Sequence, residues 1–325
     1  MENYAYFIIL FISNLILFSF FLKIANKIGF IDKSNKFGNP ITVTSAGIII
    51  YINLIVIFLI QFFFKDNFVD NLPNNFFFTL AALSILVFIS TADDLKPIDP
   101  KIRLIFQLIC IYFSITSIPI YTIDLPIKIS IFICLCIWVY ILNITNFTDG
   151  SDGFLAINTI FVFLNLIILD KFFYLNIFST KIIPFLLPSL IVFCYLNKPN
   201  ARIYLGDGGS ILIGFINGFI FLELMTTNML NIAISLLIYP IFDCSIALTK
   251  KTFQGKMPWV DISNYSFLQP IIKKNINKFF VFKLNILFNI INSLLIFSQF
   301  YFGWYLFLLN ILLTLIFINI YEKKK

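Results

Sequence analysis

The chain of 325 residues contains no histidine, and charged residues make up only 12% of it. The absence of histidine excludes zinc sites built on imidazole and any mechanism in which an imidazole is the general acid or base. Five cysteines are present, but all lie within or beside long apolar runs, which is unlike the spacing of a disulfide framework. A hydrophobic content of 60% excludes an ordinary soluble domain.

What the sequence does contain is a series of apolar runs of the kind that cross about 30 Å of hydrocarbon as helices. They are predicted near 4–22, 43–64, 76–92, 104–121, 125–142, 154–169, 182–196, 210–227, 229–248, 280–299 and 301–320. These eleven runs predict an all-α polytopic membrane protein, with residues 1–325 forming one integral membrane domain. No basic residue precedes the first run, so we interpret it as a retained helix and not as a cleavable signal peptide.

The lysines and arginines predict the orientation of the chain. Nineteen of the 23 basic residues fall in alternate loops or in the C-terminal tail. By the positive-inside rule these loops, near 23–42, 93–103, 143–153, 197–209 and 249–279, are cytoplasmic, the N-terminus is outside and the C-terminus is inside. This bias accounts for most of the net charge of +7, so no nucleic-acid partner is expected.

Aspartates gather on the same predicted side, in three loops with distinct motifs. The stretch "STADDLKPIDPKIRLIFQ" (90–107) contains Asp93 and Asp94, "NITNFTDGSDGF" (143–154) contains Asp149 and Asp152, and "NKPNARIYLGDGGS" (197–210) contains Asp207. Taken singly, each motif has a structural interpretation: a solvated helix exit, an Asp-Gly turn, or a helix N-cap. Together they indicate a cytoplasmic site of hard carboxylate oxygens, which suits Mg²⁺ or Mn²⁺ bridging to a diphosphate.

The three motifs, in this order on alternate loops, resemble the polyprenyl-phosphate N-acetylhexosamine-1-phosphate transferase family, the bacterial glycosyltransferase 4 group. The resemblance extends from 29–36 to 239–251. It implies transfer of a sugar-1-phosphate from a UDP-activated amino sugar to undecaprenyl phosphate, with release of UMP, at the bacterial inner (plasma) membrane. It also implies a Mg²⁺ cofactor (Mn²⁺ as the variant) and contact with membrane lipids, and a homodimer is one assembly it allows.

The resemblance also implies roles for residues that match the motifs. They are Asp152 and Asp207 for the metal; Asp93 and Asp94 for catalysis near the lipid phosphate; Asn146, Asp149 and Asn197 for the nucleotide or for loop order; and Lys101 and Arg103 for the lipid phosphate. The branch that uses a muramoyl-pentapeptide carries a histidine-rich C-terminal pattern, which this sequence lacks. This absence and the eleven runs favour the O-antigen, common-antigen and teichoic-acid branch.

The last predicted cytoplasmic loop departs from the family, which carries a His-x-His-His cluster there. If the Asp that precedes this cluster is aligned with Asp261, the histidine positions hold Asn264, Ser266 and Phe267. We expect Asn264 and Ser266 to bind substrate instead, helped by Lys250, Lys251 or Lys256. Trp259, Tyr265 and Phe267 are candidates for stacking on a sugar or for dipping into the membrane interface.

Three other interpretations remain open. A degenerate relative would bind lipid or nucleotide without turnover, which the missing histidines allow. A lipid or solute transporter fits the hydropathy, although the acids lie at one interface and no internal repeat is found. A CDP-alcohol phosphotransferase needs an Asp-Gly-x-x-Ala-Arg motif, and "DGSDGFLA" lacks its Ala-Arg.

Overall fold

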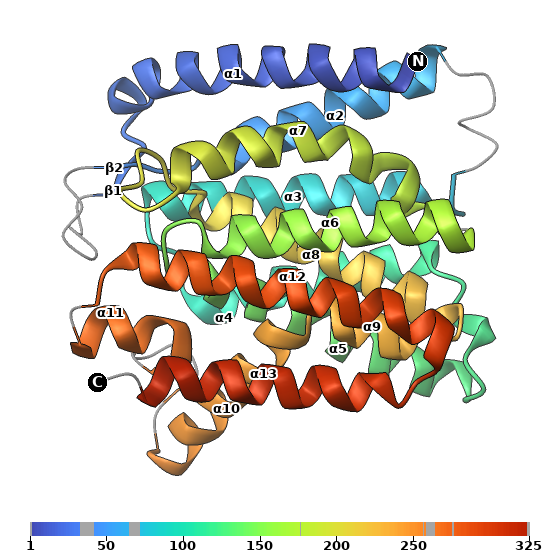
Figure 1. Ribbon diagram of the computed structural model, residues 1–325. Coiled ribbons are helices and arrows are strands. Elements are labelled where there is room, and N and C mark those ends of the chain that lie inside the picture. Colours follow the sequence, from blue (N-terminus) through green and yellow to red (C-terminus); the bar gives the residue numbers. More distant parts are fainter. Residues whose placement is uncertain are drawn as a thin grey trace.

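The computed structural model describes residues 2–32, 42–64, 72–175, 177–255, 257, 264–274 and 276–323, and most of them are helical. Figure 1 shows the long helices lying side by side along one direction, with the two ends of the chain at opposite ends of the bundle. The helices are α1 (Glu2–Ile28), α2 (Gly47–Phe64), α3 (Phe76–Leu95), α4 (Pro100–Ser114), α5 (Ile127–Thr148), α6 (Phe154–Phe173), α7 (Ser179–Asn197), α8 (Gly206–Thr226), α9 (Leu230–Leu236), α10 (Ile238–Phe253), α11 (Gln269–Lys274), α12 (Lys278–Phe302) and α13 (Leu306–Lys323). The all-α polytopic fold predicted from the sequence is confirmed.

The predicted membrane-spanning runs all fall on helices, but not all of these helices are long. Within the described residues, eight helices are long and apolar enough to cross a membrane, and the pair α9 and α10 would make nine. This pair is bent by 74°, whereas the sequence predicted one continuous span over 229–248. The predicted span at 104–121 is α4, of 15 residues, followed by the 3₁₀ turns Ile115–Ser117 and Ile120–Thr122 on either side of Pro119. The number of spans and their orientation therefore stay predictions.

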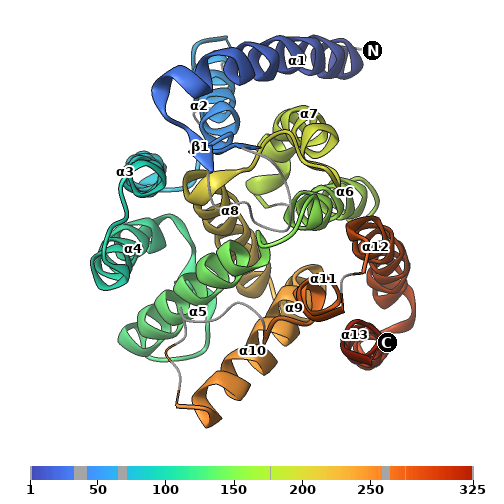
Figure 2. The ribbon, with the colours of Figure 1, turned by 90° about the vertical axis from the view of Figure 1, so that its left-hand side faces the viewer.

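Helix α8 forms the centre of the bundle, and Figure 2 shows the other helices arranged around it. Its most apolar window is 89% buried, the largest share among the candidate spans. Glycines allow the neighbouring helices to come close: a Cβ on Gly218 would lie 2.0 Å from the Trp138 ring, and one on Gly47 of α2 would lie 2.0 Å from Gly209 Cα. Small residues at helix contacts are a common packing device in membranes.

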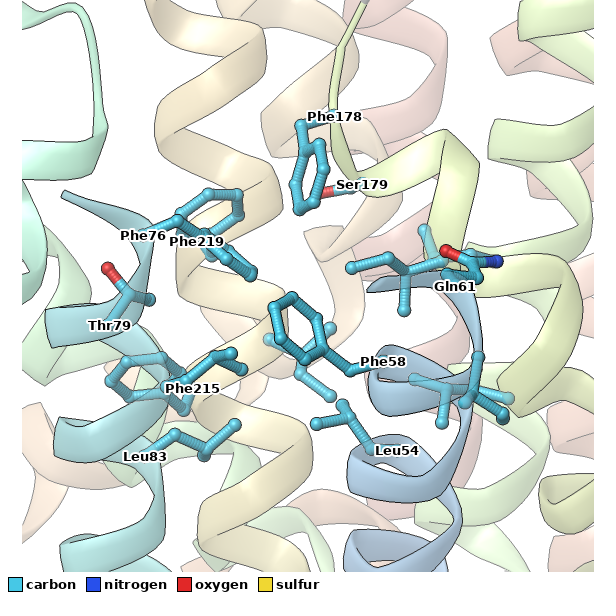
Figure 3. A pocket seen from close by; sticks show the side chains of 16 residues that line it. Leu54, Phe58, Gln61, Phe76, Thr79, Leu83, Phe178, Ser179, Phe215 and Phe219 are labelled. Carbon is cyan, nitrogen blue, oxygen red and sulfur yellow. The ribbon is translucent and has the colours of Figure 1, made fainter. Parts of the chain in front are cut away.

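An apolar pocket of about 630 Å³ lies between α2, α3, α7 and α8 (Figure 3). Phenylalanine rings form much of its wall, among them Phe76 and Phe178, whose ring centroids are 4.7 Å apart. Because Phe76 begins α3 and Asp93 and Asp94 lie near its end, the pocket is at the end of α3 that lies away from the acidic loops. None of the predicted site residues lines it.

Candidate active site

The acidic loops meet in one open cleft of about 970 Å³. It is lined by Asp32, Thr44, Asp94, Asn146, Phe147, Asp149, Gly150, Ser151, Asp152, Asn197, Tyr204, Gly206 and Asp207. Six of the predicted site residues are in this set, and they come from all three motifs. The structure therefore brings together residues up to 113 positions apart, from Asp94 to Asp207.

The first and third motifs are joined by hydrogen bonds to Asp94. Its Oδ1 accepts from the backbone N–H of Asp207, at 2.8 Å, and its Oδ2 accepts from Ser45 Oγ, at 2.7 Å. Asp207 stands in the first turn of α8, where the positive end of the helix dipole favours negative charge. Gly206 precedes it with φ +76°, and a Cβ there would lie 2.4 Å from Asp94 Oδ2. A side chain at position 206 would therefore be strained and would displace the Asp94 carboxylate.

Arg103 connects two carboxylates of different motifs. Its Nη1 donates to Asp207 Oδ2 at 2.7 Å and also to Asp93 Oδ2. Asp93 Oδ1 accepts from the backbone N–H of Ile98, at 2.5 Å. Neither Arg103 nor Asp93 lines the cleft, and Arg103 is connected to it through the hydrogen bond to Asp207. Lys101, also absent from the lining, is exposed at the start of α4.

The second motif is tied to the third through Asp152, which also pairs with a lysine from a distant helix. Asp152 is 4% exposed, and its Oδ2 accepts from Lys278 Nζ at 3.2 Å and from the backbone N–H groups of Asn200 and Ala201, at 3.2 and 3.4 Å. Lys278 opens α12, 126 positions after Asp152. The sequence analysis did not assign this lysine to the site, because no local signal connects it to Asp152.

Two asparagines of the predicted site also join elements. Asn197 Oδ1 accepts from the backbone N–H of Gly153, at 2.9 Å, and its Nδ2 donates to the Ile203 carbonyl, at 2.7 Å. Asn146 Oδ1 accepts from Ser210 Oγ on α8, at 3.2 Å. These contacts join separate elements of the cleft, as the loop-ordering role would require, and the roles of both side chains stay predictions.

The cleft also includes residues that sequence reasoning did not assign to a site. The short strands β1 (Ile31–Asp32) and β2 (Thr42–Val43) pair in antiparallel fashion, with Asp32 opposite Thr42. Val43 then bridges to Ile203, and the Tyr204 N–H donates to the Val43 carbonyl at 2.7 Å. This pairing brings Asp32, Thr44 and Tyr204 to the cleft. The pairing joins segments some 160 positions apart, so no local sequence motif predicts it.

The segment that replaces the family's histidines packs largely inside the protein. Ser266 is fully buried: its backbone N–H donates to Asp243 Oδ1 at 3.0 Å, and its Oγ lies 2.7 Å from Tyr239 OH. Asn264 is half-buried and does not line the cleft, and its Nδ2 has no hydrogen-bond partner within the described residues. The structure thus does not bring Ser266 to the predicted substrate site, because its polar atoms bond to Asp243 and Tyr239 in the protein interior.

The aromatic residues of this segment are buried as well. Tyr265 and Phe267 are at most 1% exposed, and the Phe267 ring stacks on Phe154 at 4.3 Å between centroids. Burial raises the pKa of the Tyr265 phenol. Tyr265 also stacks on Phe147, which lines the cleft, at 5.9 Å. These two rings therefore support the cleft wall and are not available to stack on a sugar. Trp259, Lys256 and Asp261 lie outside the described residues.

Lys250 and Lys251, the other proposed helpers, differ in their surroundings. Lys250 Nζ pairs with Glu322 Oε1 at 2.5 Å on the partly exposed side of α10. Lys251 is buried, and its Nζ lies 3.5 Å from Tyr265 OH and 4.8 Å from the centre of that ring. Only Lys251 therefore lies against the aromatic residues that support the cleft.

The donor set of the cleft suits a hard divalent cation. Asp32, Asp94, Asp149, Asp152 and Asp207 offer carboxylate oxygens. No group of three or more His, Cys, Asp or Glu residues in the described ranges is arranged to hold a metal by itself. Mg²⁺ does not require such a cage, because it is commonly bound by one or two carboxylates plus substrate phosphates and water. The residues present thus fit a Mg²⁺ ion that is completed by a diphosphate.

Comparison with known proteins agrees with this arrangement. Residues 76–225 match the family described as glycosyl transferase family 4. The phospho-N-acetylmuramoyl-pentapeptide-transferase of Leuconostoc citreum is 31% identical over 142 residues, which are 40% of this chain and 43% of that protein. The protein of the same name from Campylobacter lari is 27% identical over 188 residues, 45% of this chain and 53% of that protein.

The chain thus spans about half the length of the curated relatives it matches. Their shared name belongs to the branch that the sequence motifs disfavoured, so the comparisons support the family and not the predicted branch. The matched segment runs from α3 to α8 and contains every predicted site residue except Asn264 and Ser266. Residues 76–225 therefore carry the sequence pattern of glycosyl transferase family 4, on the helices that form the cleft.

Proposed function

We propose that this protein transfers a sugar-1-phosphate from a UDP-activated amino sugar to undecaprenyl phosphate at the cytoplasmic face of the bacterial inner membrane. The observation that carries the proposal is the convergence of Asp94, Asp149, Asp152 and Asp207 on one cleft at an end of an apolar helix bundle. Aspartates, glycines and an arginine at a helix start suit a diphosphate with its metal. The family match over the same helices supports this reaction class.

In the reaction, an oxygen of the lipid phosphate attacks the β-phosphorus of the UDP-sugar. A new P–O bond forms, the bond between the two phosphates of the donor breaks, and UMP leaves. A phosphate monoester has a second pKa of about 6, so the attacking group is already ionised at neutral pH and needs no histidine as base. Phosphoryl transfer mainly requires alignment and charge neutralisation. A cleft without imidazole is therefore compatible with turnover.

Mg²⁺ would be held by Asp207 and Asp152, and it would neutralise the diphosphate charge as a Lewis acid. Asp207 lies in the first turn of α8, and both Asp207 and Asp93 accept hydrogen bonds from Arg103 Nη1. Asp152 Oδ2 already accepts from Lys278, so metal binding there competes with this lysine. Asp93 and Asp94 would act near the lipid phosphate. Arg103 and Lys101, which lie on α4 outside the cleft lining, would supply positive charge for that phosphate.

Asn146, Asp149 and Asn197 are proposed to hold the loops around the nucleotide. For Asn197 the two hydrogen bonds to backbone groups favour the loop role. Of the two residues at the histidine positions, Asn264 is the better candidate for binding substrate, because its Nδ2 has no hydrogen-bond partner within the described residues. The polar atoms of Ser266 are already hydrogen-bonded inside the protein. If Asn264→Ala and Ser266→Ala both leave turnover and substrate affinity unchanged, neither side chain replaces a family histidine.

The test is transfer of radiolabelled sugar phosphate from UDP-sugars to undecaprenyl phosphate, with Mg²⁺ and with EDTA. We expect activity that requires Mg²⁺, or Mn²⁺ in its place, and that is lost in Asp207→Asn and Asp93→Asn. Activity that is insensitive to both substitutions would refute the site. If no UDP-N-acetylhexosamine gives a lipid product, a degenerate binding protein or a transporter becomes the better interpretation.

The donor is the finer part of the proposal. We infer an N-acetylhexosamine donor and a role in initiating O-antigen, lipopolysaccharide or a related surface glycan, because the histidine-rich pattern of the muramoyl-pentapeptide branch is missing. A second candidate is UDP-N-acetylmuramoyl-pentapeptide, which the printed names of the relatives favour. A panel that contains both donor types decides between them by which lipid product forms.

A further inference from the structure

A second cavity lies inside the bundle, and several polar side chains border it although the surrounding helices belong to the apolar core. It is bordered by α5, α6, α8, α12 and the junction of α9 with α10. The space open to the centre of a water-sized sphere is about 20 Å³, which exceeds the ~10–15 Å³ that one water requires. None of the predicted site residues lines it.

Three amide atoms that border this cavity have no hydrogen-bond partner within the described residues: Asn158 Nδ2, Asn217 Oδ1 and Asn292 Oδ1. All three side chains are more than nine-tenths buried. The orientation of two of the amides is fixed by their other atoms. Asn158 Oδ1 accepts from Asn289 Nδ2 at 2.7 Å, and Asn292 Nδ2 donates to the Ser235 carbonyl at 3.0 Å. The cavity therefore faces two orphaned acceptors and one orphaned donor.

The break between α9 and α10 adds a further acceptor. Leu236 and Pro240 both border the cavity, and proline has no N–H to donate to the carbonyl four residues earlier. The Leu236 carbonyl consequently lacks its usual helical partner at the point where the two helices bend by 74°. In a membrane such a group must be satisfied from within the protein.

Threonines of α5 and α6 border the cavity from the other side. The hydroxyls of Thr145 and Thr159 donate to the carbonyls of Ile141 and Leu155, at 2.8 and 2.9 Å. A hydroxyl that has donated its proton can still accept. The cavity is thus rich in acceptors and has no carboxylate on its wall.

We propose that this cavity is a binding site for one buried water molecule, which joins α6, α8 and α12 at the α9–α10 break. A water donates two protons and accepts at two lone pairs, so it can donate to Asn217 Oδ1 and Asn292 Oδ1 while accepting from Asn158 Nδ2. A monovalent cation fits less well, because it would face the Asn158 N–H group and find no counter-charge. The inference does not depend on the proposed reaction.

The position of the site gives the water a structural role. Thr145 and Thr148 border the cavity, and their neighbours Asn146 and Asp149 on the end of α5 line the cleft. A water that joins α6, α8 and α12 there therefore lies directly beside the end of α5 that lines the cleft.

The first measurement is thermal unfolding of the full chain in detergent, for Asn217→Leu, Asn292→Leu and the double variant. The matched control is Asn310→Leu, because Asn310 on α13 is fully buried with both amide atoms unpartnered within the described residues and does not border the cavity. If a water is bound, each cavity variant lowers Tm by roughly 2–4 °C. The double variant lowers it by less than the sum, since both side chains share one water, while Asn310→Leu keeps or raises Tm.

A dry cavity gives the opposite pattern: the substitutions at 217 and 310 raise Tm alike and the double variant is additive, which overturns the proposal. The wild-type Tm is also compared in NaCl and in choline chloride. A higher Tm in NaCl that disappears in Asn217→Leu would mean that the cavity binds a cation, and this result would also overturn the proposal. If a cavity variant does not fold, a high-resolution map of the wild type decides, by density within hydrogen-bond distance of the three amide atoms or its absence.

Discussion

Replacing Gly206 by alanine tests how much the contact between the first and third motifs contributes. The residue has φ +76°, and a Cβ would lie 2.4 Å from Asp94 Oδ2 and 2.8 Å from Ser45 Cα. A left-handed alanine costs about 1–2 kcal/mol. The Cβ also displaces the Asp94 carboxylate from its bonds to the Asp207 N–H and Ser45 Oγ.

A hydrogen bond to a charged group contributes about 1.5–3 kcal/mol. If one such bond is lost in the reacting complex, kcat/KM falls about 10- to 150-fold. The assay is transfer of radiolabelled sugar phosphate at subsaturating UDP-sugar, with thermal unfolding measured alongside.

Gly255→Ala is the matched control for this experiment. Gly255 has φ +66°, and an added Cβ meets no atom of the described residues within 4 Å. Both variants therefore carry the left-handed cost, but only Gly206→Ala disturbs the carboxylate. We expect the control to lose some thermal stability and to keep its activity. Equal activity of the two variants would refute the argument that the close approach at Gly206 positions Asp94.

Three further substitutions test the network around the cleft. Asn197→Leu leaves the Gly153 N–H and the Ile203 carbonyl without partners and should lower the free energy of unfolding by about 2–5 kcal/mol; an unchanged Tm would contradict the loop-ordering role. Arg103→Gln should reduce transfer more than tenfold, because Asp93 and Asp207 lose their shared cation, and turnover near wild type would show that this pairing is dispensable. Lys278→Met should lower the Mg²⁺ concentration for half-maximal activity if Asp152 binds the metal; an unchanged or higher midpoint in a Mg²⁺ titration argues that Asp152 only orders the loop.

The positions of the helices were largely predictable because hydrophobic runs of membrane length are a local signal. The bend at Leu237 was not, because residues 229–248 form one predicted apolar run until the missing N–H of Pro240 and the surrounding amides are considered. The end of α4 at Ser114 was missed for a similar reason: the 3₁₀ turns beside Pro119 are as apolar as the helix before them.

For the site, the three loop motifs were enough to select Asp94, Asp149, Asp152 and Asp207, and the family resemblance added Asn146 and Asn197; all six line the cleft. The histidine-replacing segment was harder. Ser266 aligns with a functional position by sequence distance, yet the structure buries it beside Asp243 and Tyr239. Alignment carries residue identity but not the direction of a side chain.

The sequence by itself determined the helical membrane fold, the clustering of aspartates on alternate loops and the exclusion of histidine chemistry, since these depend on composition and on local periodicity. Only the tertiary structure decided which cation each carboxylate meets: Arg103 for Asp93 and Asp207, and Lys278 for Asp152. It also brought Asp32, Thr44 and Tyr204 to the cleft. The ion pairs of Arg103 and Lys278 join residues from 10 to 126 positions apart. An ion-pair or hydrogen-bond partner is defined by distance in space, and helix packing alone sets that distance.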